Sequence, residues 1–301
     1  MSLNKICLWF GISRQAYYQS LHDTTVSCIK EELIVKYVRG IKKDHSKMGA
    51  RKIYELTQPF LAQNKIKMGR DGLFKILKNN KLLVRYRKSQ IKTTNSNHRF
   101  KKYPNLIRNL VAKRPNEIWV SDITYWKIGH KKHLYISLIT DAFSRKIVGY
   151  HLSESIETIE VIKALRMALS AFKGAESHSK LTHHSDRGIQ YCSNEYVKLL
   201  QDNLVAISMT ENGDPLENAI AERVNGIIKN EYLDGYDIDY FETAKTLLDH
   251  AIRLYNEERP HLSLNNKTPS LIHSEKSNSK IKRLWKNYYQ NKRTIVNHEV
   301  Y

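Results

Sequence analysis

The order of strand-like and helix-like segments after residue 116 constrains the fold of this chain more than any other feature. EIWVSDITYW at 117–126 alternates apolar with polar residues and is rich in β-branched and aromatic side chains, a pattern typical of a strand. Two more strands, joined by a turn near Ser144, are predicted within 131–152. The elements predicted after them are a helix at 155–172, a strand at 181–185, a helix at 193–204, a strand at 205–209, and helices at 216–233 and 243–256.

Three strands in series, followed by helices that alternate with two further strands, predict an α/β domain built on a mixed sheet with helices on both faces. This is the element order of a ribonuclease-H-like domain. We expect such a core to span residues 113–272 and to be followed by a basic tail at 273–301.

The start of the chain predicts helices only. LNKICLWFGISRQAYYQSL contains a short helical segment, a turn at Gly11 and a second helix capped by Ser13, and helical spacing resumes from Cys28 to Lys43. The first two helices suit a helix-turn-helix, which would place Arg14 and Gln15 where side chains meet DNA. An ordinary helical hairpin has the same pattern, so a purely structural role stays open.

A short internal echo follows, with KMGARKIYEL at 47–56 and KMGRDGLFKI at 67–76. Each places Lys-Met-Gly before a helical run, which predicts a second helix-turn-helix-like unit within a DNA-binding region at 1–88. A basic linker is expected at 89–112. The basic residues expected to contact DNA from these segments are Arg51, Lys52, Arg70, Lys75, Arg85, Arg87 and Lys88.

The net charge of +20 lies entirely in the first part of the chain. Residues 1–116 hold 26 Lys and Arg against 6 Asp and Glu, whereas residues 117–301 hold 24 of each kind. This asymmetry favours a polyanionic partner, most simply double-stranded DNA, because cations that bind phosphates release counterions. The alternative is a solvated surface that serves only solubility.

Cysteine spacing and hydropathy narrow the class of protein further. Cys7, Cys28 and Cys192 form no CxxC pair, which argues against a zinc module or a disulfide framework and suits a reducing compartment. No apolar run approaches the roughly 20 residues that span a bilayer, and the N-terminus lacks the pattern of a signal peptide. We expect a cytoplasmic protein without a membrane partner.

Three acidic residues occupy positions that the predicted fold would bring together. Asp122 lies inside the first strand among aromatic residues, where a carboxylate is costly unless it is paired or bound to metal. Asp186 ends the fourth strand in HHSDRGIQY, and Glu222 lies on the helix after the fifth strand. Three such acids supply the hard oxygen ligands that Mg²⁺ prefers, with Mn²⁺ as a possible substitute. Two ions could clamp the attacking and leaving oxygens of a phosphodiester displacement.

The helix that carries Glu222 also offers groups suited to phosphates. Lys229 follows seven residues later, almost two turns, so both side chains share one face. Asn218 and Asn225 share a face in the same way, and we expect all three of Asn218, Asn225 and Lys229 to contact DNA.

The spacing of these residues resembles that of a known family. Thirty-five residues separate Asp186 from Glu222, and together with WVSDITYW, HHSDRGIQY, GDPLENAIAERVNG and YNEERPHLSL the pattern is similar to the insertion-sequence-three family of bacterial transposases. The match is to the product of the second reading frame and, more distantly, to retroviral integrases. The resemblance implies that Asp122, Asp186 and Glu222 bind two Mg²⁺ ions and that Lys229 contacts transposon-end DNA.

The resemblance also implies an activity and its partners. The activity would be Mg²⁺-dependent cleavage and strand transfer at the terminal inverted repeats of an insertion sequence. The partners would be the repeats and target DNA, a second copy of the chain in a homodimer or larger assembly, and the upstream-frame protein of the same element. A bacterial, nucleoid-associated location would follow. Two other functions remain open, a regulator that binds DNA without catalysis and a nuclease or junction resolvase on the same fold.

Several other residues have two interpretations each. Asp141 could bind metal, although its neighbours favour a turn. His183 and His184 could act as bases or pack in the core, and Arg259 and His261 could contact DNA or mark the end of a helix. Trp119 and Trp126 are expected in the core.

Overall fold

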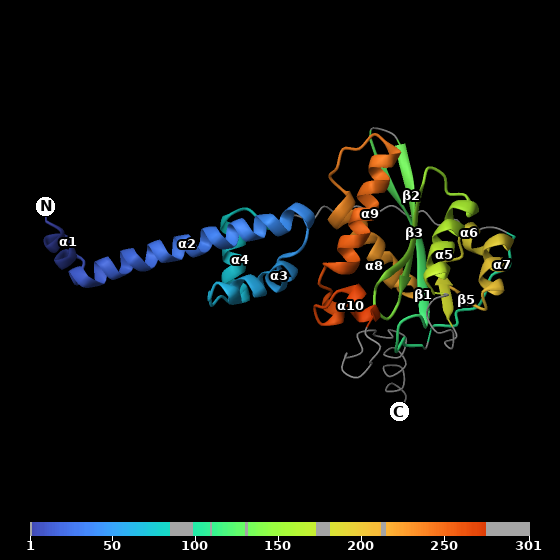
Figure 1. The fold of residues 1–301 in the computed structure, drawn as a ribbon, viewed down its shortest axis with the longest axis horizontal. Helices are drawn as coiled ribbons and strands as arrows, with labels where there is room; N and C mark the ends of the chain where they lie inside the picture. Colours follow the sequence, from blue (N-terminus) through green and yellow to red (C-terminus); the bar gives the residue numbers. More distant parts are fainter. Residues whose placement is uncertain are drawn as a thin grey trace, which may run out of the picture. The chain divides into compact units, whose positions relative to one another are not determined.

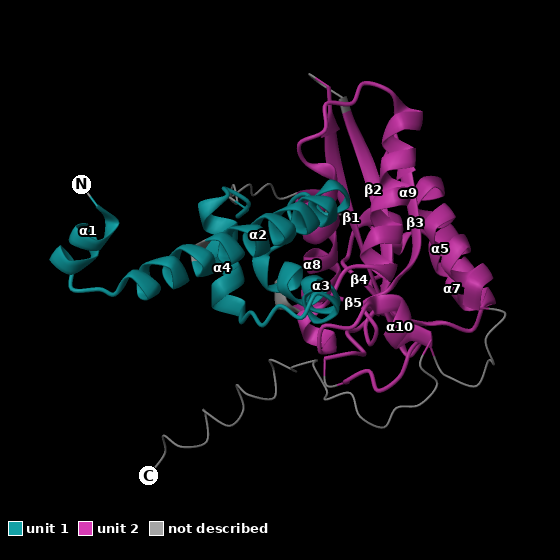
Figure 2. Cartoon of the chain, turned by 60° about the vertical axis from the view of Figure 1, so that its left-hand side comes forward, with its two compact units in different colours: residues 1–86 teal, residues 87–301 magenta. Residues whose placement is uncertain are grey.

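The computed structural model describes residues 2–84, 99–108, 110–129, 132–172, 181–211 and 215–274 (Figure 1). The chain divides into two compact units, Met1–Tyr86 and Arg87–Tyr301 (Figure 2). Three of the residues expected to contact DNA, Arg85, Arg87 and Lys88, lie outside the described residues, as does the tail from 275 onward. No helix in the described segments is both long and apolar enough to cross a membrane.

The first unit is a helical domain with its own small core. Its helices are α1 (Leu3–Trp9), α2 (Arg14–Asp44), α3 (Ala50–Gln63) and α4 (Arg70–Asn79). The core is made of apolar residues from the second half of α2, from the turn after it, from α3 and from α4, namely Ile34, Val35, Val38, Met48, Ile53, Leu61, Leu73, Ile76 and Leu77. Both copies of the sequence echo enter a helix directly after their glycine, at Gly49 and Gly69, as predicted.

Helix α2 differs from the sequence prediction. Ser13 caps it as expected, since its hydroxyl accepts a hydrogen bond of 3.0 Å from the Ala16 amide. The helix then continues without a break for 31 residues, whereas two separate helical segments were expected. Nothing interrupts it because residues 22–27 contain neither proline nor glycine. The short recognition helix predicted after Gly11 is therefore the first part of one long helix.

The second unit is built on a five-stranded mixed sheet, as predicted. Its strands are β1 (Ile118–Ile128), β2 (Lys132–Asp141), β3 (Ile147–Ser153), β4 (Thr182–Ser185) and β5 (Ala206–Met209). They lie in the order β3-β2-β1-β4-β5. The pairs β1-β2 and β2-β3 are antiparallel, while β4 runs parallel to both β1 and β5.

Helices cover both faces of this sheet (Figure 1). On one face lie α5 (Thr158–Phe172), α6 (Ile189–Cys192) and α7 (Asn194–Asp202), which share a buried cluster with Trp119 of β1. On the other lie α8 (Ala219–Ile227), the π-helical turn η2 (Ile228–Leu233) and α9 (Phe241–Glu257), packed around Trp126. The remaining short elements are η1 (Pro215–Asn218), η3 (Leu262–Leu264) and α10 (Pro269–Ser274). Both tryptophans are core residues, as expected.

The single helix predicted at 216–233 divides into three segments, the 3₁₀ turn η1, α8 and η2. The wider π turn ends where the Asp234 amide donates to the Lys229 carbonyl over 2.7 Å. Within it Glu231 is buried and forms two hydrogen bonds, of 2.8 and 2.9 Å, with the buried guanidinium of Arg259. Arg259, the partner of Glu231, is 28 residues further along the chain, so the local sequence pattern could not reveal this pair.

The core begins earlier than the predicted residue 113. Within the segment assigned to the linker, the Pro104 carbonyl accepts a hydrogen bond from the Met209 amide, and the Leu106 amide donates to the Ser208 hydroxyl. Ile107 is buried beside β1 and α8. Residues 104–107 therefore lie against β5, the edge strand, and belong to the core; a half-buried ion pair between Arg108 and Glu211 adds to this contact.

Candidate active site

Asp122 and Asp186 are brought together by the register of two parallel strands. Strand β1 pairs with β4 at Ile118↔Thr182, and the same offset holds through Val120↔His184. Continued by two residues, it aligns Asp122 with Asp186, which directly follows the end of β4. The two carboxylates thus occupy equivalent places along neighbouring strands of the sheet, although Asp186 follows Asp122 by 64 positions in the sequence.

Asp122 faces the helix α8, on the side of the sheet that alternation predicts. Its Oδ2 accepts a hydrogen bond of 2.9 Å from the Asn225 side-chain amide, and its Oδ1 accepts one of 2.9 Å from the Ile123 backbone. Burial, together with the neighbouring charges of Asp186 and then Glu222, raises the pKa of Asp122 to about 7 against the opposing hydrogen bond from Asn225. The described surroundings of Asp122 therefore favour the neutral form of this carboxyl group.

Asp186 is held by the turn that follows it. Its Oδ1 accepts a hydrogen bond of 2.9 Å from the Gly188 amide. A β-carbon at position 188 would lie 3.0 Å from the same oxygen, so a larger residue there would press against the carboxylate. The Asp-Arg-Gly sequence thus keeps the acid at the strand end.

Glu222 lies in the first turn of α8, and its residue is exposed. Burial raises its pKa, and the charge of Asp186 raises it in addition. Asp186 thus acts electrostatically on both other acids, which places the three carboxylates in one neighbourhood. Such a group of like charges is what a bound cation neutralises.

The donor set fits a hard divalent cation in kind, although the side chains are not drawn together into a ligating arrangement. Among the described residues, no three His, Cys, Asp or Glu side chains lie close enough to hold an ion. Beside Asp122, however, the Oδ1 atom of Asn225 is buried without a hydrogen-bond partner. An acceptor of this kind suits a water molecule in the shell of a Mg²⁺ ion, which usually keeps several waters.

Asn218 and Asn225 do not lie where the sequence analysis expected. Both are buried, and the Asn218 side-chain amide donates to the Ser121 carbonyl over 2.9 Å while that of Asn225 donates to Asp122. Their expected contact with DNA is therefore corrected to a positioning role, in which both amides fix strand β1 against α8. The error arose because the helical face that they share points toward the sheet.

Lys229 is partly exposed at the start of η2. Its ammonium lies 4.5 Å from the ring centroid of Tyr125 on β1, a cation–π contact. This contact orients the side chain along the same strand that carries Asp122. The position is compatible with the contact to DNA that the resemblance implies.

The two histidines of HHSDRGIQY are buried hydrogen-bonding residues of the sheet. His183 Nε2 bonds to the hydroxyls of Ser121 and Tyr196, whereas His184 bonds to Ser208 and to the Glu217 carbonyl. Burial lowers the pKa of His183 to about 3 and that of His184 to about 4, so both are neutral near pH 7. The core interpretation holds for both of them.

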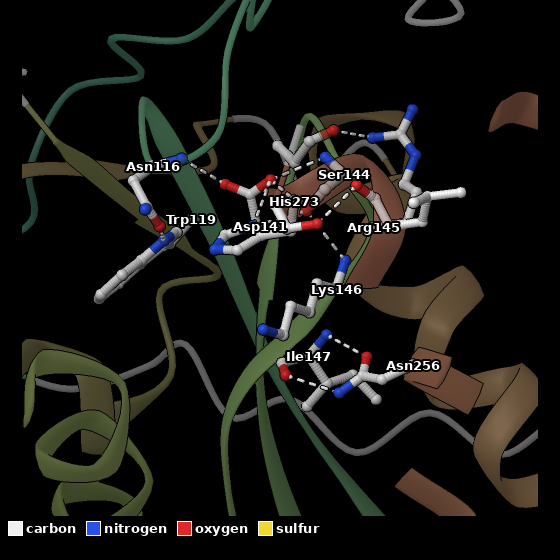
Figure 3. A network of polar contacts seen from close by, with 12 residues as sticks. Asn116, Trp119, Asp141, Ser144, Arg145, Lys146, Ile147, Asn256 and His273 are labelled. Atoms are coloured by element: carbon white, nitrogen blue, oxygen red, sulfur yellow. Dashed lines mark hydrogen bonds and ion pairs between the residues drawn. The ribbon is translucent and has the colours of Figure 1, made fainter. Parts of the chain in front are cut away.

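Asp141 belongs to the turn between β2 and β3 rather than to the site of Asp122 (Figure 3). Its carboxylate accepts hydrogen bonds from the Asn116 amide at 2.7 Å, the Ser144 amide at 2.7 Å and the Ser144 hydroxyl at 2.6 Å. Asn256 adds two bonds to the backbone of Ile147. The interpretation of Asp141 as a turn acid agrees with these contacts.

The YNEERPHLSL segment supports the fold. The Tyr255 hydroxyl donates to the Arg145 carbonyl, and Asn256 binds the start of β3 (Figure 3). Arg259 is 1% exposed and forms an ion pair with Glu231, so its guanidinium is not accessible to DNA in this conformation. Sequence reasoning missed Glu231, because a lone acid on a helix gives no sign that it faces inward.

The basic residues expected to contact DNA lie on the first unit. Arg51, Arg70 and Lys75 are exposed and Lys52 is partly exposed, on α3 and α4. Arg14 and Gln15 are exposed at the start of α2, where the Arg14 guanidinium lies 5.7 Å from the ring centroid of Tyr18.

Comparison with known proteins identifies the family. The integrase core domain family matches residues 112–215, and a second integrase core domain family matches residues 203–269. The insertion element IS600 uncharacterized 31 kDa protein of Shigella sonnei is 32% identical over 273 residues, which cover 88% of this chain and 96% of that protein. This chain belongs to the insertion-sequence transposases with an integrase core.

A second relative is itself named a transposase. The transposase for insertion sequence element IS629 of Shigella sonnei is 32% identical over 234 residues, or 74% of this chain and 75% of that one. Among solved structures, the HTLV-2 integrase catalytic core domain in complex with magnesium aligns with a TM-score of 0.42 and 23% identity, over 53% of this chain and 97% of that one. The family match confirms the predicted fold class, enzyme class and resemblance to insertion-sequence-three transposases.

Proposed function

We propose that this transposase cleaves the terminal inverted repeats of an insertion sequence and joins the freed ends to target DNA in a metal-dependent reaction. The observation that carries the proposal is the register of β1 and β4, which aligns Asp122 with Asp186, together with the charge of Asp186, which raises the pKa of both Asp122 and Glu222. Two acids on or directly after the neighbouring strands β1 and β4 and one on α8, in a chain of this family, would serve as ligands for divalent cations.

Each acid has a definite part in the proposal. Asp122, Asp186 and Glu222 would hold two Mg²⁺ ions, which supply charge stabilisation to the attacking and leaving oxygens when bound. Asn225 keeps Asp122 in place through its hydrogen bond, and the Gly188 amide does the same for Asp186. Because burial lowers the pKa of His183 to about 3 and that of His184 to about 4, and both buried rings are hydrogen-bonded within the core, both are poor bases and neither is assigned that role.

The contacts to DNA would come from Lys229 and from the first unit. Lys229 follows Glu222 by seven residues and would bind a phosphate of the DNA near the cleaved bond. Arg51, Lys52, Arg70 and Lys75 would hold the repeat through its phosphates, in line with the basic charge of residues 1–116. The enzyme would act as a homodimer or a larger assembly, because two ends must be joined together, and the upstream-frame protein of the element would assist it.

A strand-transfer reaction tests the proposed activity. Labelled DNA carrying the element's own ends is incubated with the full chain in Mg²⁺ or in EDTA, with Glu222→Gln as the matched inactive variant. We expect cut and joined products only with the wild-type chain and Mg²⁺. Cutting without joining would instead indicate a nuclease, and binding without cutting would indicate a regulator.

Salt dependence tests the assignment of the first unit to DNA. The affinity for duplex DNA should fall steeply with salt, and removal of Arg70 or Lys75 should reduce the slope of log K against log salt by about one unit each. Replacement of Lys163, which is engaged by Glu160 on α5, serves as the control and should leave the slope unchanged. A flat salt response of the wild-type chain would contradict the assignment.

A further inference from the structure

The first five turns of α2, Arg14–Leu33, extend beyond the core of the helical unit. Every described side chain in this stretch is exposed, apart from Val26 and Glu31, which are partly exposed. Burial begins only at Ile34. The stretch is about 30 Å long, and it lacks the packing against a neighbouring surface from which protein helices draw most of their stability.

One side of this stretch carries five exposed apolar side chains, here called the α2 stripe. Their exposed fractions lie between 36% and 53%, and they are Tyr17, Tyr18, Leu21, Ile29 and Leu33. At 100° per residue they fall within one half of the helix circumference, centred about 140° from the side that carries Ile34, Val35 and Val38 into the core. The stripe therefore faces away from the core of its own unit.

Charge indicates that the partner of the stripe is protein and not nucleic acid. Residues 14–33 hold two basic and three acidic residues, whereas residues 34–86 hold fourteen basic and three acidic ones. Phosphates would be attracted to the second stretch and slightly repelled by the first. An apolar surface with balanced charge is typical of a helix-to-helix contact.

The two ends of the stripe carry opposite charges. Arg14 and Glu32 are 18 residues apart, which is five turns, so both side chains lie on the same line along the helix and within the apolar side. A second copy in parallel would bring like charges together at both ends. A second copy in the antiparallel direction would bring each arginine to a glutamate.

We propose that the α2 stripe pairs with the stripe of a second copy of this chain as an antiparallel two-helix contact. Arg14 then meets Glu32 of the second copy, Tyr17 meets Ile29, and Tyr18 meets Cys28. The contact is isologous, so every pair occurs twice about a two-fold axis near Asp23. It is a contact through the helical unit and is independent of the acids in the sheet.

The mass of the full chain in solution, measured by light scattering without DNA over a range of concentrations, tests the charge pairing. Arg14→Glu and Glu32→Arg should each weaken the dimer by about tenfold, because each creates two repulsive pairs, and the double variant should recover most of the loss. Lys30→Glu, on the opposite side of the helix, is the control and should change little. A wild-type chain that stays monomeric, or single variants without effect, would overturn the proposal.

Cys28 allows a second test that also decides the direction. It is exposed, while Cys7 and Cys192 are buried. In the antiparallel arrangement the two Cys28 thiols lie about 15 Å apart along the helices, so mild oxidation should not link the wild-type chain. Tyr18→Cys places a thiol opposite Cys28 of the second copy and should give a covalent dimer, which the added change Cys28→Ser abolishes.

The other outcomes of this oxidation identify other occupants. Linkage of the wild-type chain through Cys28 would indicate parallel helices and contradict the proposal. An absence of linkage in the Tyr18→Cys chain would indicate that another part of the chain, or the upstream-frame protein, covers the stripe. Both variants keep the full length of the helix, because neither introduces proline or glycine.

Discussion

Two aspartates on neighbouring strands of the same sheet, Asp122 on β1 and Asp141 at the end of β2, have opposite surroundings. Asp141 is fully buried and accepts three hydrogen bonds from the backbone and the hydroxyl of its own turn and from the Asn116 amide. Asp122 accepts two, and its other neighbours are the charges of Asp186 and Glu222. The fold supplies hydrogen-bond donors to the carboxylate of Asp141, whereas it places negative charges beside that of Asp122.

The difference separates a structural acid from the acid that is proposed to bind metal. A buried carboxylate that is surrounded by donors stabilises the turn that supplies them. A carboxylate with acidic neighbours raises the free energy of the folded protein until a cation or a proton joins it. Number of donors and sign of the neighbouring charge therefore distinguish the two roles better than burial does.

The largest effect should appear in catalysis. Asp122→Asn should abolish cutting and joining of element ends, a loss of at least about a thousandfold, because the proposed site would lose one of its three metal ligands. Asp141→Asn should retain most of its activity per folded molecule. Product yield at equal concentrations of folded protein, with DNA binding measured alongside, checks both statements. Equal losses of activity in the two variants would contradict the different roles given to Asp122 and Asp141.

The next effect concerns folding. Asp141→Ala leaves the buried amides of Asn116 and Ser144 without an acceptor and should lower the free energy of unfolding by about 3–5 kcal/mol. Asp122→Ala leaves a gap but removes an opposed charge, so its loss should be clearly smaller. Urea denaturation of the two variants and the wild type gives the order. A larger loss at Asp122 would contradict the assignment of roles.

The smallest effect is a dependence of stability on pH in the absence of metal. Since the folded pKa of Asp122 is raised to about 7 from its usual value near 3.8, its favourable contribution is complete below pH 4 and is lost as the pH rises through 7. Wild-type stability should therefore fall over this window by on the order of 2–3 kcal/mol more than that of Asp122→Asn. Thermal unfolding in EDTA at pH 5 and pH 8 measures this difference. If the two chains show the same slope, the charge of Asp122 is not opposed by its neighbours.

Much of the fold followed from local pattern. The alternation in EIWVSDITYW and the helical spacing after 155 predicted all five strands and their order along the chain, because strands and amphipathic helices leave periodic signatures. The turn near Ser144 was also predicted from the sequence. The continuous α2 was not, since polar residues at 22–27 weakened the apolar spacing without breaking the helix.

The roles of side chains on α8, in the 3₁₀ turn before it and after the end of α9 depended on neighbours far away in sequence. Asn218 and Asn225 are residue types that often contact DNA, yet the turn and the helix present them to Ser121 and Asp122. Arg259 resembles a basic residue near a substrate, yet it is buried against Glu231. A sequence gives the type of each side chain, and only packing decides whether its partner is a phosphate or another residue.

By itself, the amino-acid sequence determined the class of this protein and the concentration of positive charge before residue 117, and it predicted the three acids, because residue type and spacing are local properties. The tertiary structure decided which acids are satisfied and which are opposed, and which side of α2 is left uncovered. Those properties depend on pairs such as Asp122 with Asp186, which strand register brings together across 64 residues of chain. Electrostatic energy depends on distance in space, and the fold alone sets that distance.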